Sequence, residues 1–229
     1  MNITKLAQGF QARFNGQGRR MLNWPKEKVR EETLALAGDL IAWGKQLKPE
    51  RQHDFIKIAS LAVQIHDADT HQHQLRVPLI SYHIGYELHL PWPELKDLLW
   101  AASTHDFGKV FIPKEVLNKN GAWDEDEIDY KRLHLLTAFY IFDSIPYLKG
   151  AAGIIANQHI FDGYTVKSGP QRLSLATEIL SAVDCFDARI FPRSYHDGFE
   201  RNHVLRRLEE RKYDQRILQL ITGLPFAAA

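Results

Sequence analysis

The chain has 229 residues with 29 Lys and Arg against 28 Asp and Glu, so it can bury one sizeable core, and no bulk charge draws it to DNA or anionic lipid. Cys185 is the single cysteine, which excludes an internal disulfide, and the first residues lack the long apolar region of a secretory signal. No apolar run approaches the ~18 residues that a membrane helix needs, so we expect a cytoplasmic protein with no DNA and no membrane partner.

Apolar residues recur at the spacing of an α-helix in one segment after another. Asp124 and Glu127 add a start that resembles a capping box to one of these segments. The sequence shows no regular apolar–polar alternation joined by hairpin turns. The pattern predicts an all-α fold, with helices within residues 29–47, 55–65, 79–88, 92–104, 123–145, 148–159, 172–190 and 200–224.

The breaks between these segments are short, and the sequence contains no low-complexity linker or internal repeat. A soft boundary falls at residues 48–50. We therefore expect an N-terminal helical extension over residues 1–50, one helical domain over residues 51–223, and a short tail over residues 224–229.

His105 and Asp106 follow directly after an apolar helical segment. Neighbouring residues on a helix point about 100° apart, so both side chains reach one ion only where a helix end faces a cavity. Imidazole and carboxylate together suit iron, manganese, zinc or cobalt, without distinguishing among them. His73 is a candidate for a further ligand. Asp184 is another, because a carboxylate within an apolar stretch is costly unless it is paired or metal-bound; a capping or salt-bridged Asp is the alternative.

The order His73, His105-Asp106, Asp184 resembles the H…HD…D pattern of the HD superfamily of metal-dependent phosphohydrolases. More narrowly, several segments occur in the order seen in the HD-GYP family, whose members hydrolyse cyclic di-GMP. These segments are THQHQLRV, HDFGKVFIPKEVLNK, RLH, DGY, AVDCFDA, RSY and YDQRIL. The resemblance covers roughly residues 65–221 and implies an HD-domain helical bundle of the HD-GYP type behind the N-terminal extension.

The resemblance also implies roles for individual residues. His73, His105, Asp106 and Asp184 would bind the metal common to HD proteins. Asp106 would also be catalytic, together with Lys109, which matches the family lysine near the scissile phosphate.

Four further positions match the family more loosely. His134 would bind a second metal. Arg193 in RSY would contact phosphate, and Tyr164 in DGY would contact the substrate. Asp69 occupies a position where some members add a carboxylate for a third metal.

The chain departs from the family at the second metal. Where the family has His-His-Glu, this chain reads Asn157-Gln158-His159, and neutral amides are poorer ligands for transition metals. All three remain candidates, because His159 would compensate if the helix end were shifted. We expect one tightly bound divalent transition-metal ion and at most a weak second one.

Two other positions also differ from the family. Glu178 stands where the family has an arginine, and an acid there would repel the phosphates of a dinucleotide. Pro78 follows LRV where the family helix continues. This proline predicts that His73 lies in or before the first turn of its helix, where proline is tolerated.

These features together imply metal-dependent hydrolysis of a phosphoester by a water that the cation activates. A cyclic dinucleotide such as cyclic di-GMP is the first substrate class, and a smaller nucleotide or phosphomonoester is the second. The alternative is a catalytically degenerate signalling module that binds a nucleotide or a protein partner without hydrolysis. In that case HDFGK is kept as a helix end, with Gly108 as its C-cap.

Overall fold

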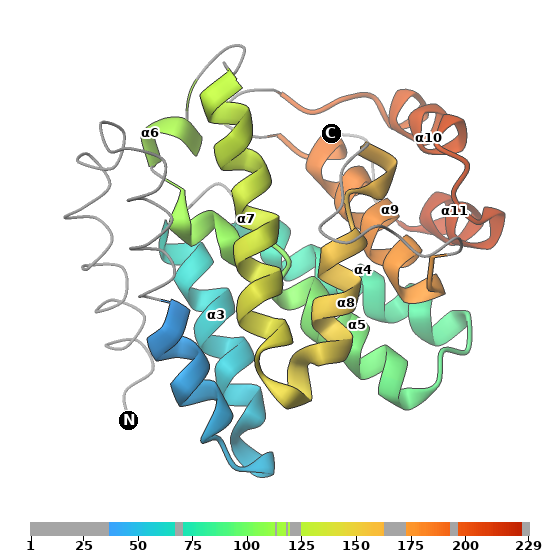
Figure 1. Ribbon diagram of the computed structural model, residues 1–229. Coiled ribbons are helices and arrows are strands. Elements are labelled where there is room, and N and C mark those ends of the chain that lie inside the picture. Colours follow the sequence, from blue (N-terminus) through green and yellow to red (C-terminus); the bar gives the residue numbers. More distant parts are fainter. Residues whose placement is uncertain are drawn as a thin grey trace.

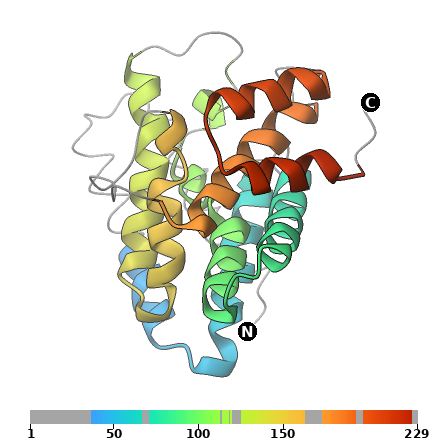
Figure 2. The ribbon, with the colours of Figure 1, turned by 90° about the vertical axis from the view of Figure 1, so that its right-hand side faces the viewer.

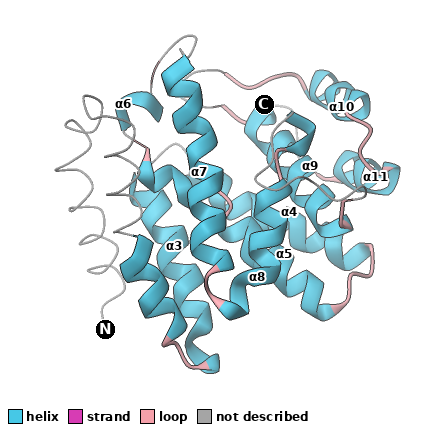
Figure 3. Ribbon diagram, in the orientation of Figure 1, coloured by secondary structure: helices cyan, strands magenta, loops and turns pink. Residues whose placement is uncertain are grey.

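The computed structural model describes residues 37–66, 71–112, 114–117, 119, 125–162, 173–192 and 197–225, and the regular secondary structure within these ranges is helical (Figure 1, Figure 3). The prediction of an all-α fold is confirmed. A helical stretch over residues 37–45 comes first. The α-helices that follow are α3 (Gln52–His66), α4 (His71–Glu87), α5 (Trp92–Thr104), α6 (Lys114–Leu117), α7 (Glu125–Asp143), α8 (Lys149–Asn157), α9 (Leu175–Ile190), α10 (Arg201–Glu210) and α11 (Gln215–Gly223). The 3₁₀-helices are η1 (Pro49–Arg51), η3 (Phe107–Phe111), η4 (Pro146–Leu148) and η5 (Ile160–Asp162).

The hydrophobic core lies among α3, α4, α5, α7, α8 and α9, which pack against one another as a bundle (Figure 1, Figure 2). In α9, Ile179, Leu180 and Val183 are fully buried. Phe107 of η3 stacks on Phe142 of α7, with ring centroids 5.7 Å apart. Because Phe107 directly follows the His105-Asp106 pair, this stacking fixes the position of the pair relative to α7.

α10 and α11 pack against α9 at one side of the bundle (Figure 2). The hydroxyl groups of Ser181 and Tyr213 are hydrogen-bonded at 2.9 Å, in a buried position. The backbone N–H of Asp214 donates to the carboxylate of Glu178 at 3.2 Å. These contacts hold the turn before α11 against the first half of α9.

α4 begins five residues after the last residue of α3, and His73 is its third residue, in the first turn, as the sequence predicts. Pro78 lies in the interior of α4 rather than in that first turn, and the helix continues beyond it. Pro78 cannot donate a hydrogen bond to the carbonyl of Gln74. The burial of Val77 and Ile80 on both sides of the proline offsets this loss and keeps the segment helical.

None of the helices in the described ranges is both long and apolar enough to cross a membrane.

Candidate metal centre

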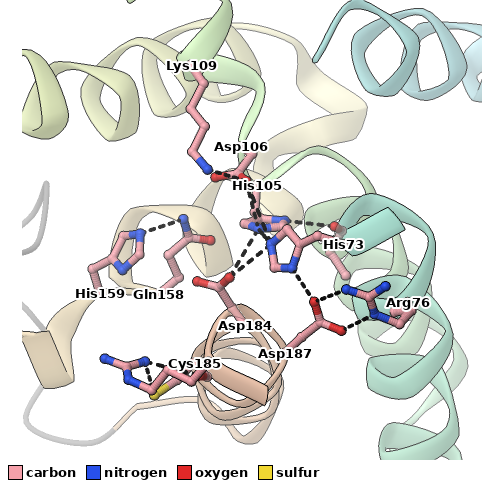
Figure 4. A network of polar contacts seen from close by, with 12 residues as sticks. His73, Arg76, His105, Asp106, Lys109, Gln158, His159, Asp184, Cys185 and Asp187 are labelled. Atoms are coloured by element: carbon pink, nitrogen blue, oxygen red, sulfur yellow. Dashed lines mark hydrogen bonds and ion pairs between the residues drawn. The ribbon is translucent and has the colours of Figure 1, made fainter. Parts of the chain in front are cut away.

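Four side chains with metal-ligand chemistry converge where α4, the end of α5 and α9 meet (Figure 4). His73 comes from the first turn of α4, and Asp184 from the middle of α9. His105 is the residue at the C-cap position of α5, and Asp106 is the residue at the N-cap position of η3. The residues His73, His105 and Asp106 are almost completely buried, with 1%, 0% and 4% of their surface exposed. The sequence-predicted set for the first metal is therefore brought together in one place.

The ligand atoms of this set are spaced as they would be around a single cation. Nε2 of His73 lies 3.2 Å from Nε2 of His105 and 3.2 Å from Oδ1 of Asp184. Nε2 of His105 lies 3.5 Å from Oδ1 of Asp184. Oδ2 of Asp106 lies 3.7 Å from Nε2 of His73 and 3.5 Å from Nε2 of His105. Ligands bound at about 2.0 to 2.2 Å around one ion are about 3 to 3.5 Å apart, so His73, His105 and Asp184 fit a divalent cation, and Asp106 borders them at a slightly larger distance from His73.

Both imidazoles are held by their other ring nitrogen. Nδ1 of His73 contacts Oδ2 of Asp187 at 2.7 Å, and Nδ1 of His105 contacts the carbonyl oxygen of Ala102 at 2.9 Å. An Nδ1–H that donates to an oxygen leaves Nε2 as the lone-pair nitrogen, which is the usual arrangement of metal-binding histidines. When both imidazoles are neutral, the two Nε2 atoms therefore present lone pairs to the same point.

Sequence reasoning missed Asp187 and its partner Arg76. The guanidinium of Arg76 donates from Nε to Oδ1 of Asp187 at 2.6 Å and from a terminal nitrogen to Oδ2 at 3.0 Å. The same guanidinium lies 3.7 Å from the ring centroid of Phe191. A signal was present in the sequence, because Arg76 follows His73 by three residues and Asp187 follows Asp184 by three. Residues at this spacing share one face of a helix.

The charges of the cluster shift the pKa values of its members. Burial lowers the pKa of His105, but the carboxylates of Asp106 and Asp184 outweigh burial and raise this pKa to about 9. Burial raises the pKa of Asp106, yet Lys109 and the two imidazoles lower it far below its usual range. Hydrogen bonds from His105 and His73 outweigh burial in the same way at Asp184 and lower its pKa. Without a cation, the pKa shifts thus favour a protonated His105 between the ionised carboxylates of Asp106 and Asp184.

Lys109 lies against the carboxylate of Asp106. Its Nζ donates to Oδ2 of Asp106 at 2.7 Å, and its side chain is 24% exposed. In a 3₁₀-helix, residues three apart lie nearly in line, so Lys109 lies on the same side of η3 as Asp106. The ammonium group therefore borders the cluster from the side that retains some contact with solvent.

Gly108 lies where the backbones of η3 and α7 meet. A Cβ atom at this position would collide with the backbone carbonyl of His134, so a larger residue cannot be accommodated without a shift of α7. Gly108 lies inside η3, and among the described residues the glycine with positive φ is Gly198. The expectation of Gly108 as a helix C-cap is therefore wrong, because the C-cap of α5 is His105. Because Gly108 has no side chain, the backbone of His134 can lie close to the HD motif.

The candidates for a second metal are brought together only in part. His134 is 3% exposed, and its ring packs edge-on against the ring of His159 with centroids 5.7 Å apart. Nε2 of Gln158 and Nε2 of His159 are hydrogen-bonded at 3.2 Å, so the amide engages that imidazole nitrogen. The Oε1 atom of the buried Gln158 has no hydrogen-bond partner within the described part of the chain. In Figure 4, Gln158 lies between His159 and the first cluster.

Asn157 differs from its neighbours. Its Nδ2 donates to the carbonyl oxygen of Gly153 one turn earlier in α8, at 3.0 Å. The amide thus engages the backbone of its own helix. This hydrogen bond involves Nδ2 and not Oδ1, the atom that would bind a cation, so Asn157 as a metal ligand stays a prediction.

The remaining candidate residues fall into two groups. Asp69, Tyr164 and Arg193 lie outside the described residues. Glu178 is described, and its carboxylate accepts a hydrogen bond from the backbone of Asp214 at the start of α11. The expectation that Glu178 faces the phosphates of a substrate is not supported, because its carboxylate is engaged in holding α11.

The model of the HD domain family matches residues 39–217, which is more than half of the chain. The chain belongs to the HD domain family. The resemblance to the HD superfamily is therefore confirmed. Of the H…HD…D residues, His73, His105 and Asp184 form one possible metal-binding group, and Asp106 lies beside its two imidazoles.

Several curated proteins are similar to this member of the HD domain family. The cyclic di-GMP phosphodiesterase of Thermotoga maritima is 26% identical over 161 residues, which cover 68% of this chain and 44% of that protein. The cyclic di-GMP phosphodiesterase response regulator RpfG of Xanthomonas campestris is 25% identical over 189 residues, covering 80% and 50%. The 3'3'-cGAMP-specific phosphodiesterase 1 of Vibrio cholerae is 27% identical over 158 residues, covering 66% and 37%. The chain spans half or less of the length of each of these relatives.

Proposed function

We propose that this protein is a metal-dependent phosphohydrolase, with a cyclic dinucleotide as the first substrate class. The observation that carries the proposal is the convergence of His73, His105 and Asp184 at separations of 3.2 to 3.5 Å, with Oδ2 of Asp106 3.5 to 3.7 Å from the two Nε2 atoms. The relatives in Thermotoga, Xanthomonas and Vibrio support the choice of substrate, because their names specify cyclic di-GMP or 3'3'-cGAMP. A smaller nucleotide or phosphomonoester is the second class to test.

His73, His105, Asp106 and Asp184 would hold one divalent cation. Two imidazoles and two carboxylates form a mixed donor set that suits iron, manganese, zinc or cobalt. Such a cation supplies Lewis acidity, which lowers the pKa of a water and offsets charge on a phosphoryl oxygen. Asp187 and Arg76 would keep the ring of His73 in its binding orientation.

Asp106 and Lys109 would act on the reacting groups. Asp106 stays ionised because its pKa is depressed, so its carboxylate can accept a hydrogen bond from the attacking water and orient it. The ammonium of Lys109 borders the same carboxylate and would shift towards the negative phosphoryl oxygens as the water oxygen bonds to phosphorus and the ester oxygen departs. Tyr164 and Arg193 would contribute to substrate binding from the segments that the structure does not describe.

One observation favours a second candidate function, a signalling module that binds a nucleotide or a protein partner without hydrolysis. Asn157 and Gln158 stand where the HD-GYP pattern has two imidazoles, and the amide of Gln158 is hydrogen-bonded to His159. The two functions differ in turnover but share metal binding. Two measurements on protein purified without added metal distinguish the two functions. Elemental analysis gives the metal content, and a hydrolysis screen over cyclic dinucleotides, linear dinucleotides and phosphomonoesters gives the turnover. We expect one tightly held ion per chain and turnover of a phosphodiester. A protein that retains its ion and binds a cyclic dinucleotide without cleaving it supports the second function.

A further inference from the structure

α4 carries a stripe of exposed apolar side chains on the helix face opposite to the buried face that contains His73. Leu75, Leu79, Tyr82 and Tyr86 are 46%, 70%, 38% and 61% exposed. The rings of Tyr82 and Tyr86 are stacked on each other, with centroids 6.4 Å apart. Figure 2 shows α4 at the margin of the bundle beside α5. Contiguous apolar side chains on an outer helix face are typical of an interaction surface.

The spacing of the stripe is that of a helix–helix seam. Successive members are four, three and four residues apart, which is the alternation of a and d positions in a coiled coil. The order of steps is the same in both directions along the helix. In an antiparallel pair of α4 helices with a twofold axis between Leu79 and Tyr82, Leu79 faces Tyr82 of the second copy and Leu75 faces Tyr86. Each leucine thus meets a larger tyrosine, and the same patch serves on both sides, as a twofold interface requires.

The charges around the stripe favour the same arrangement. None of the four side chains is charged, so two copies meet without like-charge repulsion. Glu87, which is exposed, is the last residue of α4 and lies at the negative end of its own helix dipole. Antiparallel pairing places Glu87 beside the first turn of α4 in the second copy, which is the positive end of that helix. A parallel pair would instead bring the two Glu87 carboxylates together.

We propose that α4 forms a homodimer interface, in which it pairs antiparallel with α4 of a second copy through this stripe. Two partly exposed leucines and two partly exposed tyrosines offer on the order of 400 Å² per copy. The pair then buries on the order of 800 Å² in total, which lies at the low end for specific interfaces and corresponds to a weak, reversible dimer. Leu75 follows His73 by two residues, so the pairing also covers the outer side of the helical turn that carries this histidine.

Sedimentation velocity of the full chain over a concentration series tests the proposal. We expect the wild type to shift from monomer to dimer as its concentration rises, and Leu79→Arg to remain monomeric. Leu79 is 70% exposed, so its replacement leaves the fold intact, which a thermal melt verifies. The matched control is Leu136→Arg on α7, where the leucine is 48% exposed, and this variant dimerises like the wild type.

Cross-linking tests the register. Under mild oxidation, a mixture of Leu79→Cys and Tyr82→Cys chains forms more covalent dimer than either variant alone, and the wild type, whose single Cys185 is buried, forms none. A wild type that stays monomeric at every concentration overturns the proposal and leaves the stripe to a different partner. A Leu79→Arg variant that dimerises as strongly as the wild type overturns it as well, as does cross-linking of Leu79→Cys alone at the higher yield.

Discussion

Replacement of Asp187 by asparagine tests whether the carboxylate behind His73 contributes to metal binding. Asp187 is fully buried and contacts Nδ1 of His73 at 2.7 Å, while it receives two hydrogen bonds from Arg76. Asparagine preserves the volume and retains one oxygen that can accept from His73. It removes the negative charge that strengthens the imidazole as a ligand and that pairs with the guanidinium.

Loss of such an outer partner typically lowers metal affinity by about 10 to 100-fold, which corresponds to about 1.4 to 2.8 kcal/mol. We expect Asp187→Asn to fall in this range, measured by competition with a chelator of known affinity. The protein should also unfold at a lower temperature with and without metal, because Arg76 loses its buried partner. The matched control is Asp143→Asn at the end of α7, nine residues beyond His134 along the helix. An Asp187→Asn protein with the metal affinity of the wild type would refute the orienting role.

Four further outcomes are expected. Lys109→Ala should lower turnover by about 10²-fold, as for loss of one electrostatic donor, while elemental analysis finds the metal retained. Gly108→Ala should destabilise the protein by about 1 to 3 kcal/mol in urea unfolding, because the added methyl group meets the backbone of α7. Metal affinity should rise as the pH rises from about 6.5 to about 9, because His105, whose pKa is raised to about 9, is protonated without metal. Below about pH 9, each binding event should therefore release a proton. Calorimetry in buffers of different ionisation enthalpy measures this proton. Gln158→His should increase the content of a second ion, because the side chain of Gln158 lies beside His159 and an imidazole is a better ligand for transition metals than a neutral amide.

The pH dependence of stability follows from the same histidine. The pKa of His105 in the folded, metal-free protein lies above the ordinary value of 6.5. Its protonation therefore stabilises the folded state fully below about pH 6.5, and this contribution is lost as the pH rises through about 9. A bound cation takes the place of the proton, so the stabilisation that metal confers should be largest at the alkaline end of this range.

The first ligand set could be predicted because two kinds of sequence signal coincide there. His105-Asp106 stands at the end of an apolar helical segment, and Asp184 stands within one. The second signal applies equally to Asp187, whose side chain is more deeply buried than that of Asp184. Had the cost of burying a carboxylate been applied to every acid of this helix, Asp187 would have been found.

Other features could not be found in local patterns because tertiary contacts determine them. Gly108 is required by the backbone of His134, which is 26 residues away in the chain. Glu178 is turned towards the N–H of Asp214 by the packing of α11 on α9, and no neighbour of Glu178 in sequence indicates this. Pro78 is accommodated inside α4 because the buried residues around it pack on α5 and α9. In each case the deciding partner lies on a different helix.

The charges of the first cluster bear on how many metal ions the site would hold. Asp106 and Asp184 together offset one divalent cation, so Lys109 leaves a single excess positive charge, which matches the single negative charge of a phosphodiester. A second divalent cation beside Asp106 would have to approach the ammonium group that already lies 2.7 Å from Oδ2 of this residue. Among the described residues, the added candidate ligands on this side are His134, His159 and the neutral amide of Gln158, and none of these three carries a negative charge to offset the repulsion. We therefore expect the one-ion state to be the resting state, and a second ion to bind only when the substrate's phosphate adds negative charge or when Lys109 is replaced.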